Sequence, residues 1–179
     1  EEAAAELLVI SGAATTTNCI ADRAGVSIGS VYRYFPDKAA VFGAVAARYA
    51  ALMEESAADF AATTVHSPAR QLPQLAMEWL VASEDFFKPG LGPALNRLRA
   101  DGIALPPLDA FESRQEERAA QWIRARLGRP DAAAEQYVRM IARAVVGVIR
   151  VTMATGPGRL AAKSTGGAIL ALLQRMTPE

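Results

Sequence analysis

The sequence is poor in the residue types from which most metal and catalytic sites are built. It contains one cysteine, Cys19, and one histidine, His66, among 179 residues. One thiol cannot form an internal disulfide, and these two residues lie too far apart in the sequence to suggest a zinc site or a nucleophile–base pair. We expect Cys19 to be a small buried residue and His66 to be exposed between two helices. The sequence therefore predicts no metal, no cofactor and no enzyme activity.

Net charge and long apolar runs are also missing. The 19 lysines and arginines balance the 19 aspartates and glutamates, so the overall charge neither requires nor excludes a nucleic-acid partner. No apolar run reaches the roughly 18 residues that a membrane span needs. The first residues lack the basic and apolar regions of a secretory signal. We therefore expect a cytoplasmic protein with no membrane partner.

Hydrophobic residues, by contrast, make up 51% of the chain and recur with helical spacing. Pairs of proline and glycine separate the apolar runs, and no segment alternates with a period of two for long enough to suggest a sheet. The fold class is therefore all-α. The runs that each share one helix face extend over residues 42–60, 72–87, 111–127 and 169–176.

A short helix is predicted over residues 17–24, close to the start of the chain. Thr15 and Thr16 precede it, and threonine hydroxyls can accept hydrogen bonds from the free N–H groups of a first helical turn. Gly25 follows it and can adopt the left-handed conformation that ends many helices.

A second short helix is predicted over about residues 28–35. Ser27 is its expected N-cap, and we expect the apolar Val26 to fill the angle between the two helices. A helix, a turn that contains glycine and a second helix form the pattern of the helix-turn-helix DNA-binding motif. The same pattern can arise inside an ordinary helical core, but here its flanking residues match as well.

The second helix carries side chains that suit a DNA groove. Gly29 adds no bulk and Ser30 can bond to either kind of base edge, so the start of this helix can approach the floor of the major groove. Ile28 can contact a thymine methyl group. The residues placed to bond phosphate oxygens, which fix the register on the duplex, are Tyr32, Arg33, Tyr34 and Lys38.

The stretch IADRAGVSIGSVYRYFPDKAAVF, residues 20–42, resembles the signature of the tetracycline-repressor (TetR) family of transcription regulators. The match extends over about residues 7–48. It implies an all-helical homodimer of about nine helices, with a helix-turn-helix DNA-binding domain over residues 1–48 and a helical ligand-binding and dimerisation domain over residues 49–179. The DNA-contacting positions of the family fall on Thr16, Thr17, Ser27, Ile28, Gly29, Ser30, Tyr32, Tyr34 and Lys38.

The sequence departs from the family pattern at two places. The spacing from Gly12 to Ile20 is one residue shorter than is common, so we expect a tightened turn after a first helix that ends near Ile10. Ile28 is the first residue of the second short helix, which corresponds to the family's recognition helix, and many relatives have a polar or basic residue at this position. This favours an apolar contact with a thymine methyl over a hydrogen bond.

The resemblance also implies an effector cavity in the second domain. Aromatic residues on its helical stripes either fill the core or line that cavity, and the sequence leaves the two alternatives open. Arg143 lies in an apolar stretch and could bind an anionic effector or extend to solvent. The candidate effector-site residues are Phe60, Trp79, Phe86, Phe87, Trp122, Tyr137, Met140 and Arg143.

A helix over residues 132–155 has two apolar stripes, which one small layer of a domain cannot cover. The small residues Ala144 and Gly147 would let a partner helix approach closely. Together with a helix over residues 168–176, this predicts a four-helix dimer interface, which the resemblance also implies. Its candidate residues are Ile141, Val145, Gly147, Val148, Thr152, Ile169, Leu172 and Leu173.

The function predicted from these features is that of a ligand-responsive transcription regulator, with a repressor favoured by the resemblance. It would bind double-stranded, palindromic operator DNA as a homodimer and be released by a small-molecule effector. The alternative is a constitutive dimeric DNA-binding protein whose second domain only dimerises. A cavity with convergent polar groups would favour the first hypothesis, and a packed core the second. An enzyme built on a helical bundle would need a catalytic constellation that the sequence does not contain.

Overall fold

The computed structural model describes residues 1–64, 90–127, 136, 139–140, 142–144 and 146–147. Every element within this part is a helix, as the sequence predicts. Six are α-helices and one is a 3-10 helix, so the expected total of about nine remains a prediction about the whole chain. The elements are α1 (Glu2–Ser11), η1 (Gly12–Ala14), α2 (Thr17–Ala24), α3 (Ile28–Tyr34), α4 (Lys38–Thr64), α6 (Leu91–Ala100) and α7 (Pro106–Leu127).

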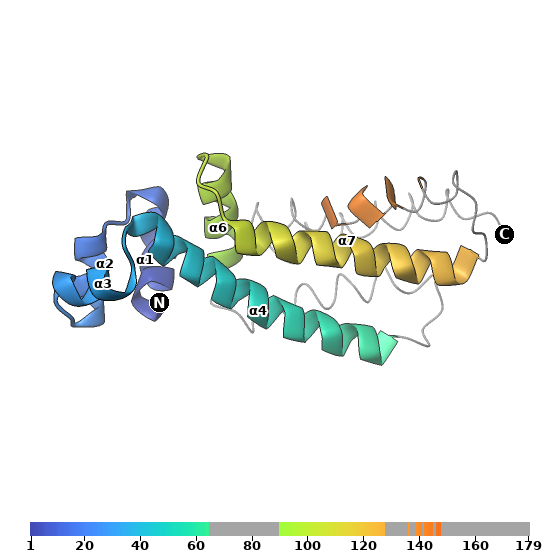
Figure 1. Cartoon of the computed structure of the whole chain (residues 1–179), viewed down its shortest axis with the longest axis horizontal. Helices are drawn as coiled ribbons and strands as arrows, with labels where there is room; N and C mark the ends of the chain where they lie inside the picture. The colour runs from blue at the N-terminus through green and yellow to red at the C-terminus, as the bar shows by residue number, and fades with distance from the viewer. Residues whose placement is uncertain (65–89, 128–135, 137–138, 141, 145, 148–179) are drawn as a thin grey trace.

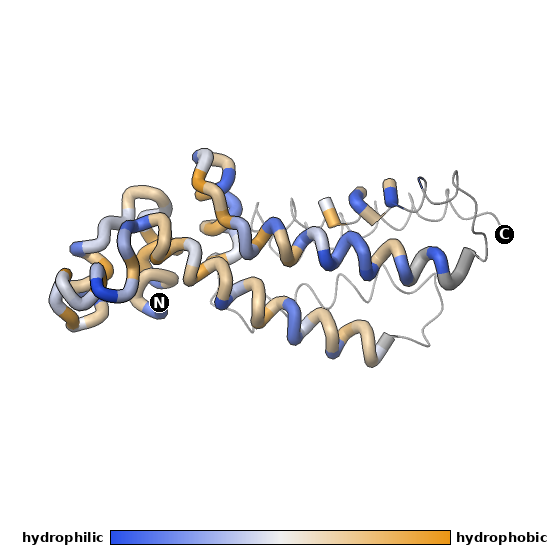
Figure 2. Tube along the Cα trace, in the orientation of Figure 1, coloured by the Kyte–Doolittle hydropathy of each residue, from blue (hydrophilic) through white to orange (hydrophobic). Residues whose placement is uncertain are grey.

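The helices divide into a compact end and two long arms. Figure 1 shows α1, α2 and α3 gathered at one end, with α4 and α7 extending away from them as the two longest helices. In Figure 2, α4 is mostly apolar, whereas α7 carries many hydrophilic positions along its length. No helix in the described part of the chain is both long and apolar enough to cross a lipid bilayer.

The turn after α1 is tight, as its short spacing predicts. The helix ends at Ser11, one residue past the predicted end, and Gly12 has a φ of +52° at the start of η1. Thr15 then turns inward and is buried, and its hydroxyl donates a hydrogen bond of 3.1 Å to the carbonyl oxygen of Leu7. The expectation that Thr15 caps α2 is therefore wrong, because its side chain instead ties the turn to α1.

One hydrophobic core joins the compact end to α6. Leu8 of α1, Phe42 of α4, and Leu95 and Leu98 of α6 have no exposed surface. Burying each such side chain contributes about 1.5–3 kcal/mol. Helix α6 was not predicted from the sequence, because the helix is only ten residues long. Helix α6 therefore covers α1 as part of the same core.

The long helix α4 crosses the predicted domain boundary without a break. Its buried residues Val45, Tyr49 and Met53 follow the predicted stripe, but Leu52 is exposed, because it lies one position outside the face that meets the core. The predicted boundary after residue 48 falls inside this helix. No linker is therefore available there to uncouple the two predicted domains.

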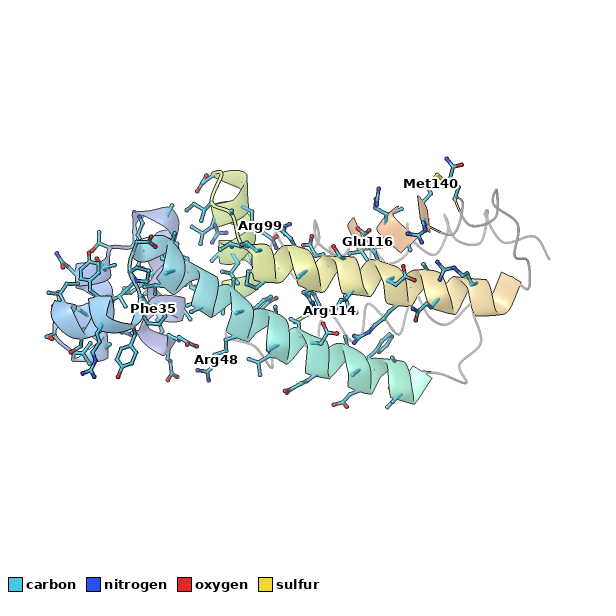
Figure 3. The ribbon with its side chains drawn as sticks, viewed as in Figure 1. Phe35, Arg48, Arg99, Arg114, Glu116 and Met140 are labelled. Carbon is cyan, nitrogen blue, oxygen red and sulfur yellow. The ribbon has the colours of Figure 1, made fainter. Side chains whose placement is uncertain are left out.

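Ion pairs tie α7 to both neighbouring helices. Arg99 of α6 contacts Asp109 at 2.5 Å and Glu112 at 2.7 Å. The hydrogen bond that Arg99 donates to the Glu112 carboxylate raises the pKa of Arg99 above its ordinary value. Glu54 of α4 contacts Arg114 at 3.2 Å and also pairs with Arg118 (Figure 3). Helix α7 is thus held against α4 and α6 by charged groups as well as by apolar packing.

Candidate DNA interface

Helix α2 starts and ends as the sequence predicts. Thr16 has an extended backbone, and its hydroxyl oxygen accepts a hydrogen bond of 3.2 Å from the backbone N–H of Cys19. Gly25 is left-handed, with a φ of 67°. The N–H of Val26 then donates to the carbonyl oxygen of Ala21 at 3.0 Å. These local hydrogen bonds fix both ends of the helix.

Two predictions about the side chains here are wrong. Val26 is 46% exposed, so the angle between α2 and α3 is closed by backbone hydrogen bonds and not by a buried side chain. Cys19 is also exposed, and the Thr16 hydroxyl lies 3.1 Å from its sulfur. The reason is that the inward face of this short helix is narrow and is filled by Ile20 and Ala21.

Helix α3 is capped by Ser27 and anchored by one residue. The Ser27 hydroxyl oxygen accepts from the Ser30 N–H at 3.1 Å and lies 2.9 Å from the Ser30 hydroxyl. Within α3, all of which the structure describes, Val31 is the one buried residue. Tyr32 is 50% and Tyr34 74% exposed. The helix therefore offers most of its surface to a partner.

The two helices are linked through hydroxyl groups. The Thr17 hydroxyl lies 3.1 Å from the hydroxyl of Tyr32, at a distance where either can be the donor. A methyl group added at Gly29 would meet only the Ser27 oxygen, at 3.8 Å, so packing within the described chain leaves this position open. The predicted base-reading position is thus unobstructed. The hydroxyl of Thr17, a predicted DNA-contacting residue, lies beside that of Tyr32, which is predicted to bind phosphate.

The cations of this region differ in what they contact. The Lys38 ammonium donates to the Ala13 carbonyl oxygen at 3.0 Å and lies over the Phe42 ring at 5.6 Å. An ammonium group has three donors, so two remain for other acceptors. Arg33 is exposed and forms no ion pair with the residues that the structure describes.

Arg23 is different, because Glu6 of α1 neutralises it. A single carboxylate oxygen of Glu6 lies 2.6 Å from Nη2 and 2.7 Å from Nε of Arg23. The two residues are 17 positions apart and belong to different helices, so their pairing was not predictable from the sequence.

The candidate effector-site residues are only partly described. Phe60 is half-buried on α4. Met140 is 53% exposed, and the side chain of Arg143 is 78% exposed with its Nε 3.3 Å from Glu116 (Figure 3). The exposure of Arg143 agrees with the alternative that it extends to solvent. Trp79, Phe86, Phe87 and Tyr137, and the side chain of Trp122, lie outside the described residues.

The candidate dimer face is described only in part. Ala144 is exposed and Gly147 is half-buried, with nothing within 4 Å of an added Cβ. Ala142 and Val146 are buried, and Ala142 packs in a cluster with Ala120 of α7. Neither residue lies on a predicted apolar stripe. Ile141, Val145, Val148, Thr152, Ile169, Leu172 and Leu173 lie outside the described residues.

No group of three or more histidine, cysteine or acidic side chains able to hold a metal ion occurs among the described residues.

Residues 2–45 match the family model described as bacterial regulatory proteins, tetR family. A comparison with curated proteins found no match. The matched residues extend from α1 into α4 and include the whole α2–α3 motif. Residues 2–45 are therefore a DNA-binding domain of the kind found in the TetR family, which indicates a DNA-binding transcription regulator.

Proposed function

We propose that this regulator is a repressor that binds a palindromic operator as a homodimer and leaves it when a small-molecule effector binds. The observation that carries the proposal is the exposed surface of α3, which Val31 alone anchors to the core. The major groove of B-DNA is about 12 Å wide and admits one α-helix. A helix held by one buried residue can enter that groove without disturbing the rest of the domain.

The contacts proposed for α3 divide into base contacts and phosphate contacts. Ser30 and Ile28, at the start of the helix, are proposed to reach base edges, with the open position of Gly29 between them. The phosphate contacts are proposed for groups that lie around the groove edges, where hydroxyls and cations fix the register. They are Thr16, Thr17, Ser27, Tyr32, Arg33, Tyr34 and Lys38.

Dimerisation is proposed because one recognition helix reads only one half-site. A dimer that meets two half-sites about 34–36 Å apart gains affinity from both. The exposure of Met140 and Ala144 and the open space at Gly147 support a partner helix on this face. The candidate interface residues outside the described part belong to the same proposal.

Release by an effector requires coupling between the two domains. Helix α4 is continuous from Lys38 to Thr64, and α6 packs in the same core as α1. A change in the second domain can therefore alter how α3 is presented. An effector can shift the two states only by the difference between its affinities for them.

The test begins with a binding-site selection that uses the full chain and random duplexes. An operator with two inverted half-sites, bound by two copies of the chain, is expected. A thermal-shift screen would then find compounds that stabilise the protein, and each would be added to the operator complex. Release of DNA by such a compound supports the proposal. Operator binding that no stabilising compound weakens would instead favour the constitutive dimer, and a site without inverted symmetry would exclude the palindrome.

A further inference from the structure

The DNA-binding domain carries few cations for its function. Residues 1–48 contain four cationic side chains and five carboxylates, a net charge of −1. Duplex DNA carries one negative charge for about every 1.7 Å of its axis, and its neutralisation by lysine and arginine supplies most sequence-independent affinity. This domain therefore begins with little attraction for DNA of arbitrary sequence.

The Glu6–Arg23 ion pair lowers that attraction further. Arg23 directs both Nη2 and Nε at one oxygen of Glu6, at 2.6 and 2.7 Å. Both side chains are accessible to solvent, and exposed pairs of this kind contribute little to folding stability. The apolar contacts of Leu8 and Ile20 hold α1 and α2 in the core without it. The pair is thus more important for the charge of the surface than for the fold.

Arg23 lies close to the start of α3 in the sequence. It is in the last turn of α2, two residues before the glycine turn that leads into α3. Helix α2 has eight residues and so rises about 12 Å. That length exceeds the Debye length of about 8 Å at physiological salt, so an uncompensated charge on Arg23 would act mainly on phosphates nearer than the far end of α2, and more strongly at low salt.

We propose that Glu6 is a specificity-determining residue, which neutralises Arg23 and so suppresses binding to DNA of arbitrary sequence. The inference rests on the operator binding proposed above. In an operator complex, α3 holds the protein in one orientation, and Arg23 has a fixed distance to the phosphates. In sequence-independent complexes the orientation varies, and each free cation attracts whichever phosphates are nearest. Freeing Arg23 would therefore raise the affinity for DNA of arbitrary sequence more than the affinity for the operator.

The change in salt dependence can be worked out. With Arg33 and Lys38 as the phosphate contacts of one protomer, log K falls with log salt at a slope of about −1.8 per protomer. Glu6→Gln releases Arg23 and adds about −0.9 to that slope. At 0.1 M salt, one additional contact raises affinity for random duplex by roughly five- to tenfold per protomer.

The experiment uses four variants of the full chain: Glu6→Gln, Arg23→Gln, the double variant, and Glu55→Gln as a control. Glu55 is exposed on α4, so its replacement changes the net charge by the same amount at a distant site. Fluorescence anisotropy with a random 24-bp duplex and with the selected operator, at several salt concentrations, gives both affinities and slopes. Thermal unfolding confirms that each variant is folded.

We expect Glu6→Gln to steepen the slope, to raise affinity for random duplex by roughly five- to tenfold per protomer at 0.1 M salt, and to lower the ratio of operator to random-duplex affinity. The double variant should return to the parental slope, because the gain requires Arg23. A parental slope in Glu6→Gln, a gain that persists in the double variant, or an unchanged affinity ratio each overturns the inference. If the parent itself does not prefer the selected operator, the proposed function fails instead.

Discussion

The hydroxyl of Tyr32 offers the sharpest test of how α3 binds DNA. It lies 3.1 Å from the Thr17 hydroxyl, and both groups are accessible to solvent. Tyr32→Phe removes this oxygen and leaves the ring in place. Because water can replace the lost partner, we expect a stability loss below about 1 kcal/mol. For a chain of this size, that shifts the melting temperature by no more than about 2–4 °C.

The expected effect on DNA binding is larger. A hydrogen bond to a charged group such as a phosphate contributes about 1.5–3 kcal/mol. At the lower value, each protomer loses about tenfold in affinity, so a dimer on a two-site operator loses about a hundredfold. The loss should be similar for operator and for mismatched sequences, since phosphate contacts carry no base information.

Operator titration by anisotropy at several salt concentrations measures this loss, and thermal unfolding measures stability in parallel. Thr17→Val is the matched variant, because it removes the other hydroxyl of the pair. If Tyr32 acts only by orienting Thr17, the double variant will bind no worse than either single one. Operator affinity of Tyr32→Phe within twofold of the parent would refute the phosphate contact.

Three further predictions concern other parts of the molecule. Ile28→Ala and Ser30→Ala should each change the motif recovered in a binding-site selection, because one base contact discriminates between base pairs by about 1–3 kcal/mol. An unchanged motif would mean that other residues read the sequence. Arg99→Gln removes the cation that contacts both Glu112 and Asp109, so chemical denaturation should show a loss of about 1–3 kcal/mol, and parental stability would contradict this. Gly147→Trp should yield a monomer in sedimentation that has lost most operator affinity, since overpacking costs about 1–3 kcal/mol or more; an intact dimer would place the interface on another face.

The features that the sequence predicted correctly are those decided by neighbouring residues. The start of α2 at Thr16, its end at Gly25 and the start of α3 at Ser27 depend on hydrogen bonds that span only a few positions. The family signature covers the same residues, so motif and local chemistry agree. The buried face of α4 was also predictable, because burial follows the helical period from Phe42 to Met53.

Features that depend on contacts between distant segments needed the tertiary structure. The ten residues of α6 form a helix that is buried against α1, and a methyl group at Gly90 would lie 3.2 Å from Val9. Cys19 is exposed because only a narrow face of α2 packs against the core. Arg23 meets Glu6 only because α1 and α2 pack together. Local chemistry therefore determined where the short helices begin and end, whereas packing between helices decided which side chains are free to meet DNA.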